Sequence, residues 1–382
     1  MRITDLKLSE PIYVPFNKGM TDAINILPAV MTYSILNVTT DEGITGNSVL
    51  YHSSLLKVLI EESLKPCVVG EDPLNSERIW DKMYWDTLRY GRRGAPISAI
   101  SHIDIAIWDL KGKILGQSVH RLIGGHRDSV ASYATSIGLE SSDEELLGDV
   151  HEFLKVGFRM IKIKLGRKEP HEDLERVRLV REAIGPKVDL AVDVNNGWSL
   201  DTAVRMAKKL EQYDVYWLEE PILADEISNM AQLARETSIP IAIGETHYTK
   251  WEFREIMEQG AAKIIQADVG KCGGVTEFLK IAALADSFGL PICPHHTEYI
   301  DVACVAGVPN GLFHEDVHDF LEPTGMLFVD PVLPRDGRIS PSAEPGFGFH
   351  FNTQMIEQLT KKPAPEETKW TARRGWRWPP YL

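Results

Sequence analysis

The chain has 382 residues, of which 43% are hydrophobic and 25% are charged, and its formal net charge is −14. This length and apolar content suffice for about two globular domains with sizeable cores. The negative balance and the lack of a Lys/Arg run argue against nucleic-acid binding, although local cations could still attract a small anionic substrate.

The cysteines and the N-terminus indicate the compartment. Cys67, Cys272, Cys293 and Cys304 lack the spacing of a zinc site or a disulfide framework. The first residues alternate like a strand and lack the apolar stretch of a signal peptide, and no run approaches the roughly 18 apolar residues of a membrane span. We therefore expect a cytoplasmic protein that has no membrane partner.

Residues 1–125 have the pattern of an α+β domain. The apolar runs Ile3–Leu8 and Met31–Thr39, with the turn-forming residues 41–43 after the second, predict strands of an antiparallel sheet. Apolar residues recur at helical spacing in Leu55–Leu64 and Pro96–Leu115.

From Ser129 onward strands and helices alternate, which predicts parallel strands joined by crossovers. Helical periodicity marks Asp173–Ile184, Ser199–Gln212 and Val275–Phe288. The expected strands are Val130–Thr135, Met160–Lys164, Asp189–Val194, Val215–Glu219, Ile241–Gly244, Lys263–Asp268, Leu290–His295 and Gly311–Glu315. Eight near-regular units favour an α/β fold of the (β/α)8 or TIM barrel type over residues 126–320, with a doubly wound open sheet as the competitor.

Residues 321–382 form a C-terminal segment with an aromatic end. That end contains Trp370, Trp376, Trp378, Pro379, Pro380 and Tyr381. Three tryptophans are unusual on a solvent-exposed tail. We expect the segment to pack on its own N-terminal domain, and a subunit contact is the alternative.

Polar residues close the apolar runs of this repeat at nearly even intervals. From Asp193 the intervals are 26, 26 and 23 residues to Glu219, Glu245 and Asp268, then 27 to His295 and 20 to Glu315. One strand, one helix and two short loops take about this length. Because barrel enzymes build their sites at the carboxyl ends of the strands, we expect these residues and Lys164 to surround one cavity.

Three carboxylates on successive strands, Asp193, Glu219 and Glu245, suit Mg²⁺ in an octahedral sphere with open positions. Taken singly, each acid has a simpler interpretation, as a turn residue before Asn195 or as a loop ion pair at Glu219 or Glu220. Together, acids clustered in a barrel mouth would repel one another and need a cation to ionise at neutral pH.

Lys162 and Lys164 point to the same side of their predicted strand. Such pairs are usually surface lysines of an edge strand. Here the strand should be central, so the lysines would be buried charges. A neighbouring ammonium and a metal would lower the pKa of Lys164 toward that of a general base.

Asp268 and His295 lie on adjacent predicted strands, so Asp268 could orient the imidazole as a base, whereas we assign a structural role to His296. If burial raises the pKa of Glu315, this residue could stay protonated and donate a hydrogen bond to a developing enolate oxygen.

The combined pattern resembles that of the enolase superfamily, mandelate racemase subgroup. It consists of Lys162-x-Lys164, Asp193, Glu219 in Trp-Leu-Glu-Glu-Pro, Glu245 in Ile-Gly-Glu-Thr, Asp268 with Lys271-Cys-Gly-Gly-Val, His295 and Glu315. The resemblance covers nearly the whole chain and implies an N-terminal capping domain and a homo-oligomer, dimers stacked into octamers. It also implies that Lys164 and His295 are bases on opposite faces of the substrate, that Lys162 contacts the substrate carboxylate, that Asp193, Glu219 and Glu245 bind Mg²⁺, and that Glu315 is the electrophile.

The implied chemistry is removal of the proton α to a carboxylate, with an enediolate intermediate stabilised by Mg²⁺. If a β-hydroxyl is present, loss of water gives a 2-keto-3-deoxy acid, and the enzyme is a sugar acid dehydratase. Without a leaving group, proton exchange between Lys164 and His295 gives a racemase or epimerase of a 2-hydroxy acid. The resemblance implies dehydration as the commoner outcome, so we expect the dehydratase and keep the racemase as the alternative. A barrel that binds metal without turnover is a third possibility.

Substrate choice is expected to lie in two loops of the capping domain, 15–27 and 48–56. Their polar residues include Asn17, Lys18, Thr21, Asp22, Tyr51, His52, Ser53 and Ser54. Such side chains suit a ligand rich in hydroxyls, although polar loops are also ordinary surface. With Lys162 and Asn195, we take Tyr51 and His52 as candidate substrate-binding residues. Arg89, Arg92 and Arg93 are either surface residues or partners of a second substrate carboxylate.

Overall fold

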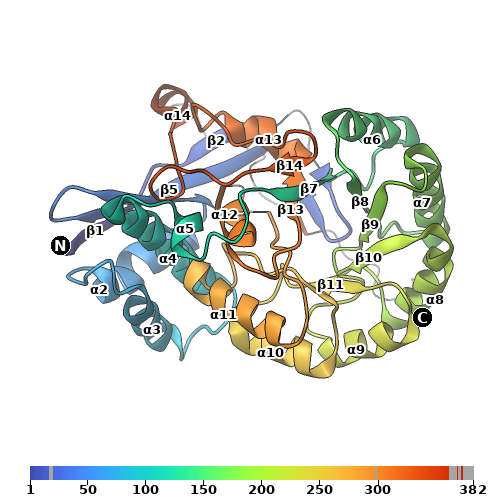
Figure 1. Cartoon of the computed structure of the whole chain (residues 1–382), viewed down its shortest axis with the longest axis horizontal. Helices are drawn as coiled ribbons and strands as arrows, with labels where there is room; N and C mark the ends of the chain where they lie inside the picture. Colours follow the sequence, from blue (N-terminus) through green and yellow to red (C-terminus); the bar gives the residue numbers. More distant parts are fainter. Residues whose placement is uncertain (17–19, 297–298, 361–367, 369–370, 373–382) are drawn as a thin grey trace.

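The structure is a computed structural model that describes residues 1–16, 20–296, 299–360, 368 and 371–372. The larger part of the molecule is a ring of parallel strands surrounded by helices. The smaller part is an antiparallel sheet with helices beside it, and it lies against one side of the ring (Figure 1).

The strands of the ring run in chain order around a barrel. Hydrogen bonds join them in the order β12-β11-β10-β9-β8-β7-β13. Single bridges from Ile265 to Ile292 and from Ile292 to Gly311 complete the circle. The strands are β7 (Val130–Thr135), β8 (Met160–Lys164), β9 (Asp189–Asp193), β10 (Val215–Glu219), β11 (Ile241–Ile243), β12 (Ile264–Ile265) and β13 (His314–Val317). The predicted (β/α)8 barrel is confirmed, and the open sheet is excluded.

Several expected strands differ from the structure. The expected strand Lys263–Asp268 is reduced to Ile264–Ile265, and β9 and β11 each end one residue earlier than expected. Leu290–His295 forms only the bridge at Ile292, because Pro291 and Pro294 on either side have no N–H to donate to a ladder. The last strand begins at His314 rather than Gly311, which takes part only in a single bridge.

Helices cover the outside of the barrel and bury their apolar faces against the strands. Ser142 begins α6 with a capping box, in which the side chains of Ser142 and Glu145 bond reciprocally to backbone N–H groups. The helices are α6 (Asp143–Val156), α7 (Pro170–Ile184), α8 (Leu200–Leu210), α9 (Ile227–Glu236), α10 (Thr249–Gln259), α11 (Gly274–Ser287), α12 (Tyr299–Gly307) and α13 (His318–Gly325). Within the described residues, no helix is long and apolar enough to cross a membrane.

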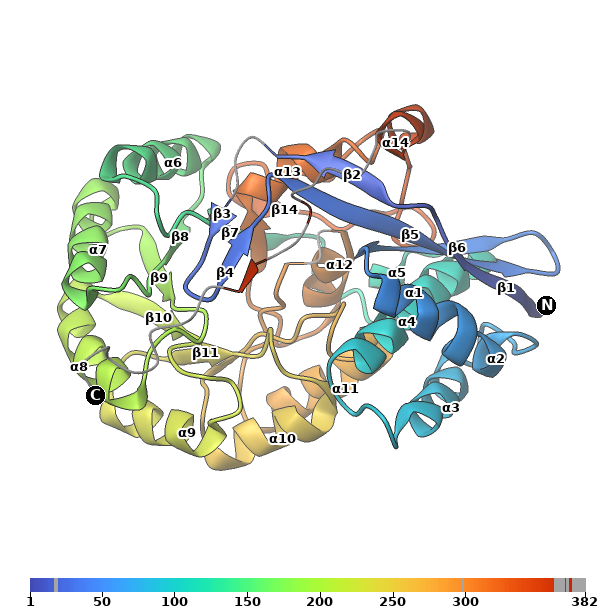
Figure 2. The same ribbon diagram turned by 180° about the vertical axis from the view of Figure 1, so that it is seen from behind.

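The capping domain is built on the long strand β5, which pairs antiparallel with three others. A hairpin of β3 and β4 extends from this domain toward the barrel (Figure 2). The elements are β1 (Ile3–Leu8), β2 (Ile12–Pro15), β3 (Met20–Thr21), β4 (Asn25–Leu27), β5 (Val30–Thr40), β6 (Thr45–Tyr51), α1 (Ser54–Val58), a π-helix (Leu59–Leu64), α2 (Lys65–Val68), α3 (Ser76–Thr87), α4 (Ala95–Leu115) and α5 (Val119–Leu122).

Buried hydrogen bonds fix the capping domain to the start of α11. The Asp104 carboxylate on α4 accepts from Thr276 N at 2.8 Å and from Thr276 Oγ1 at 2.6 Å. Gly274 has a φ of 81°, and a Cβ at this position would lie 2.4 Å from Asp104 Oδ2. The glycine therefore allows the two domains to approach closely, which holds the cap in a fixed position relative to the barrel.

The C-terminal segment contains β14 (Arg338–Ile339), α14 (Thr353–Thr360) and β15 (Thr371–Ala372). β14 pairs with β7, and β15 pairs with β4 of the cap. Leu359 of α14 shares a core with Ile12 and Val14 of β2. Trp370, Trp376, Trp378, Pro379, Pro380 and Tyr381 lie outside the described residues.

We expect Phe278→Ala to destabilise the barrel by about 3–5 kcal/mol, because Phe278 is fully buried in α11. Phe288→Ala is the matched control, since Phe288 at the end of the same helix is 45% exposed. Its effect should stay within about 0.5 kcal/mol. Urea unfolding measures the free energy of unfolding of both variants, and equal losses of stability would contradict this description of the core.

Candidate active site

Two layers of side chains fill the barrel, and the change from one to the other creates the site. The lower layer is apolar and contains Tyr133, Met160, Ala191, Trp217, Ala242, Ile264 and Cys293. Because side chains alternate along a strand, residues two positions further on also point inward, and these include Lys162, Asp193, Glu219 and Gln266. The apolar layer thus closes the barrel below a polar layer that lies toward its mouth.

The lysines of β8 enter this polar layer, whereas Ile161 and Ile163, which alternate with them along the strand, join the core under the helices. Lys162 Nζ lies 2.7 Å from Glu219 Oε1 and 2.6 Å from Glu315 Oε1. Lys164 Nζ lies 2.5 Å from Asp193 Oδ2. Each buried ammonium is therefore paired with carboxylates of other strands.

Without a metal, the pKa of Lys164 is raised, so the expected lowering near a bound metal stays a prediction. Burial opposes the charge, but the carboxylates of Asp193, Glu245 and Glu219 together outweigh burial and raise the pKa of Lys164 above its ordinary value. This direct contact between Lys164 and Asp193 is not visible in the sequence. Lys164 can therefore act as a base only when another cation shares the charge of Asp193.

Asp193, Glu219 and Glu245 form the carboxylate triad, whose members each offer one oxygen within 4.8 Å of the others. Burial raises the pKa of Glu219 to about 8, and repulsion from Asp193 adds to the rise. A cation among the three oxygens would relieve this repulsion. An all-oxygen donor set at this spacing fits one hard divalent ion such as Mg²⁺.

His295 lies between two carboxylates. Its Nδ1 is 2.9 Å from Asp268 Oδ2, and its Nε2 is 3.2 Å from Glu245 Oε2. Burial disfavours the imidazolium, but Glu245 and Asp268 outweigh burial and raise the pKa of His295 to about 9. In this arrangement the ring carries a proton at neutral pH and can donate it, while Asp268 fixes its orientation.

We expect Asp268→Asn to lower the pKa of His295, because the substitution removes one of the three carboxylates that stabilise the imidazolium. The ring should then lose its proton at a lower pH than in the wild type. NMR titration of labelled histidines measures this pKa, with His295→Asn identifying the signal. An unchanged pKa would show that Asp268 does not act on this ring.

Glu315 is a carboxylate rather than a protonated donor. Its Oε1 lies beside Lys162, and its Oε2 accepts a hydrogen bond from the His296 backbone N–H at 3.0 Å. Burial alone would raise the pKa of Glu315, but Lys162 and His295 outweigh burial and lower it. The expectation of a raised pKa is wrong because it did not include the contact with Lys162.

Asn195 lies just after the end of β9. Among the four candidate substrate-binding residues, the structure places Asn195 and Lys162 in the barrel. It has a φ of 44° and is 6% exposed. Its Oδ1 has no hydrogen-bond partner among the described residues. A buried acceptor without a partner is suited to a donor from a ligand.

Tyr51 and His52 make contacts within the capping domain. The ring of Tyr51 lies 5.0 Å from that of Tyr33, and His52 Nδ1 lies 2.9 Å from Ser34 Oγ. Asn17 and Lys18 of the other loop lie outside the described residues.

Glu220 is a buried residue that the sequence argument treated only as a possible loop ion pair. Its carboxylate accepts from Asn196 Nδ2 and from Thr246 Oγ1, both at 2.6 Å. Asn196 follows β9 and Thr246 follows β11, so Glu220 joins three loops behind the carboxylate triad. The sequence does not show these neutral partners, because they come from separate loops.

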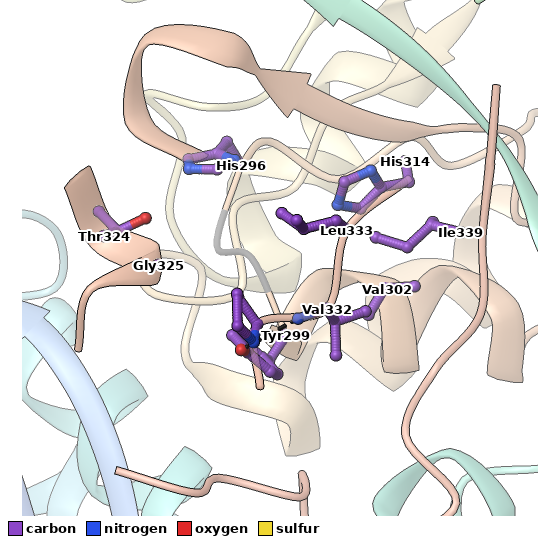
Figure 3. A pocket seen from close by; sticks show the side chains of 10 residues that line it. His296, Tyr299, Val302, His314, Thr324, Gly325, Val332, Leu333 and Ile339 are labelled. Atoms are coloured by element: carbon purple, nitrogen blue, oxygen red, sulfur yellow. Dashed lines mark hydrogen bonds between the residues drawn. The ribbon is translucent and has the colours of Figure 1, made fainter. Parts of the chain in front are cut away.

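A small cavity lies outside the barrel, between β13, α12, α13 and the segment before β14 (Figure 3). Its volume is about 20 Å³, which is room for about one water molecule. Burial lowers the pKa of His314 in its wall to about 3. This size and the mainly apolar lining do not suit a polar anionic ligand, so the barrel mouth remains the candidate site.

Comparison with known proteins gives the same assignment. The chain matches the family description "Enolase C-terminal domain-like" over residues 145–355. It matches "Mandelate racemase / muconate lactonizing enzyme, N-terminal domain" over residues 25–124.

Three similar proteins illustrate the relationship. Arabinonate dehydratase of Saccharolobus solfataricus is 36% identical over 85% of this chain and 90% of its own length. A crystal structure of a racemase from Streptomyces coelicolor A3(2) with bound magnesium has a TM-score of 0.88 and 31% identity, and covers 94% of this chain and 99% of the other. L-Talarate dehydratase from Polaromonas sp. JS666, complexed with Mg and L-glucarate, has a TM-score of 0.86 and 30% identity, with coverage of 98% and 100%. The chain therefore belongs to the enolase superfamily, in the mandelate racemase subgroup.

Proposed function

We propose that this protein is a Mg²⁺-dependent hydro-lyase that removes the proton α to the carboxylate of an acid sugar and eliminates water. The observation that carries the proposal is the placement of Lys164 and His295 at opposite ends of the carboxylate triad. Lys164 contacts Asp193, and His295 contacts Glu245. A substrate carboxylate held beside the triad would present its α-carbon to two proton-transfer groups.

Asp193, Glu219 and Glu245 would hold the Mg²⁺. When bound, Mg²⁺ supplies Lewis-acid stabilisation of the negative charge that develops on the substrate carboxylate. Lys162 supports the same charge, because its ammonium is buried and Glu219 and Glu315 fix its position.

The remaining roles follow from the protonation of each residue. Lys164 in its neutral form accepts the α-proton, and the electron pair forms a double bond as the β-hydroxyl leaves. His295 gives its proton to that hydroxyl, which departs as water. The enol then takes up a proton at the β-carbon and becomes a 2-keto-3-deoxy acid. Asn195 Oδ1 is placed to accept a hydrogen bond from a substrate hydroxyl.

The similar proteins support this substrate class. One is named for arabinonate, a sugar monoacid, and another is complexed with L-glucarate, a sugar diacid. A racemase or epimerase of a 2-hydroxy acid is the second candidate, because one similar structure is described as a racemase and the same pair of bases could exchange a proton.

The test is an incubation of the Mg²⁺-loaded protein with a panel of monoacid and diacid sugars, with semicarbazide trapping of 2-keto acids. We expect keto acid from one stereochemical set. Absence of keto acid, together with deuterium entering the α-position of a 2-hydroxy acid in heavy water, would favour the racemase. If neither product forms, the result would support a barrel that binds metal without turnover.

We make two further proposals, on the assembly of the protein and on its location in the cell. We propose a homo-oligomer, from dimer to octamer, in the cytoplasm and without nucleic-acid partners. Light scattering of the purified protein tests the assembly, and a monomer at micromolar concentration would contradict it.

A further inference from the structure

The turn between β3 and β4 lies on the ends of two barrel strands that carry the proposed site. A Cβ at Gly166 would be 2.6 Å from Ala23 Cβ, and one at Gly197 would be 2.7 Å from it. Gly166 follows Lys164 by two residues, and Gly197 follows Asp193 by four. The two glycines therefore allow this turn of the cap to reach the barrel mouth (Figure 2).

The loop after β7 holds the same turn from the other side. Thr21 O accepts from Leu139 N at 2.9 Å, and Thr21 Oγ1 accepts from Glu140 N at 3.3 Å. The turn is thus fixed to three successive segments of the barrel.

Asp22 is the charged residue of this turn, and it is 7% exposed. Its Oδ1 accepts from Ile24 N at 2.8 Å and from Asn25 N at 2.6 Å, whereas among the described residues Oδ2 accepts only from Asn25 Nδ2, at 3.1 Å. Burial raises the pKa of Asp22, and the charge of Lys164 opposes the rise. The carboxylate therefore lies in the turn that reaches the barrel mouth, with acceptor capacity left on Oδ2.

Of the three arginines suggested for a second substrate carboxylate, Arg93 is already engaged. Arg93 NH1 lies 2.7 Å from Asp225 Oδ1, and Arg93 Nε lies 3.4 Å from Glu252 Oε1. A second carboxylate beside Asp22 would thus meet a like charge, and Arg93 could pair with it only by leaving these acids.

We propose that Asp22 selects sugar monoacids, the aldonates, over sugar diacids, the aldarates. A hydroxyl at the distal end of an aldonate can donate a hydrogen bond to Oδ2, whereas a carboxylate there is repelled. The inference rests on the proposed function, since it assumes that the barrel mouth binds an acid sugar.

Isothermal titration calorimetry of the Mg²⁺-loaded protein tests the preference by binding rather than by product formation, using galactonate with galactarate and gluconate with glucarate. We expect at least one aldonate to bind at least about tenfold more tightly than its aldarate. Asp22→Asn removes the charge but keeps an acceptor for the turn, and it should bring the two affinities to within about threefold. Asp72→Asn is the matched control, because Asp72 forms a similar turn with Leu74 N elsewhere in the cap.

Equal or tighter binding of the aldarates by the wild type would overturn the inference, as would an unchanged ratio in Asp22→Asn. Failure of every acid to bind would overturn it too, because no acid-sugar site would then exist. The keto-acid assay is separate. The expected binding preference without keto acid would leave the inference standing and reject the dehydratase.

Discussion

His295→Asn should lower kcat for dehydration by about 10²–10⁴-fold, while exchange of the α-proton with solvent continues. The substitution removes the group that protonates the departing hydroxyl but leaves Lys164 beside Asp193. Keto-acid formation measures the dehydration that is lost, and ¹H NMR in D2O measures the α-proton exchange that remains.

His296→Asn is the matched control, since its ring stacks on Phe320 at a centroid distance of 5.7 Å outside the triad. It should lose much less activity. If His295→Asn stops exchange as completely as dehydration, and Lys164→Ala keeps exchange, the roles of the two residues are reversed.

Removing divalent metal with EDTA should abolish activity, and Mg²⁺ should restore it. The triad brings mutually repelling carboxylates together, so a bound cation should also stabilise the fold, by about 2.7 kcal/mol at a concentration near 100 times Kd. Thermal unfolding with and without Mg²⁺ measures this stabilisation.

Glu219→Gln should lose both the activity and the Mg²⁺-dependent rise in Tm, because the amide is a weaker ligand for a hard cation. Glu258→Gln, on the exposed face of α10, should keep both. Full activity in EDTA, or an equal rise in Tm for Glu219→Gln, would contradict the assignment of the triad.

The barrel was predictable because its strands are short buried runs between helical segments. The bounds of β7, β8 and β10 agree with the predicted ones, whereas Leu290–His295 failed because prolines interrupt its hydrogen bonding. The short hairpin of β3 and β4 was not predicted, since strands of two or three residues show little periodicity. The domain boundaries at 125 and 320 stay predictions.

The triad could be predicted because spacing alone brings carboxyl ends of neighbouring strands together. The protonation states of Lys164 and Glu315 could not be predicted, because their pKa values depend on ion pairs between strands that the sequence does not show. The position of Asp22 in the turn that reaches the barrel mouth depends on a contact between domains, through Ala23 and Gly166, and no local pattern reveals it.

The most direct test of the central claim is a ¹H NMR time course of the Mg²⁺-loaded wild type with acid sugars in D2O. The account predicts that the α-proton signal of one acid disappears as a 2-keto-3-deoxy acid forms with one solvent deuterium at its β-carbon. If every acid that binds at the triad kept its α-proton signal indefinitely, the result would contradict proton abstraction by Lys164 and the function built on it.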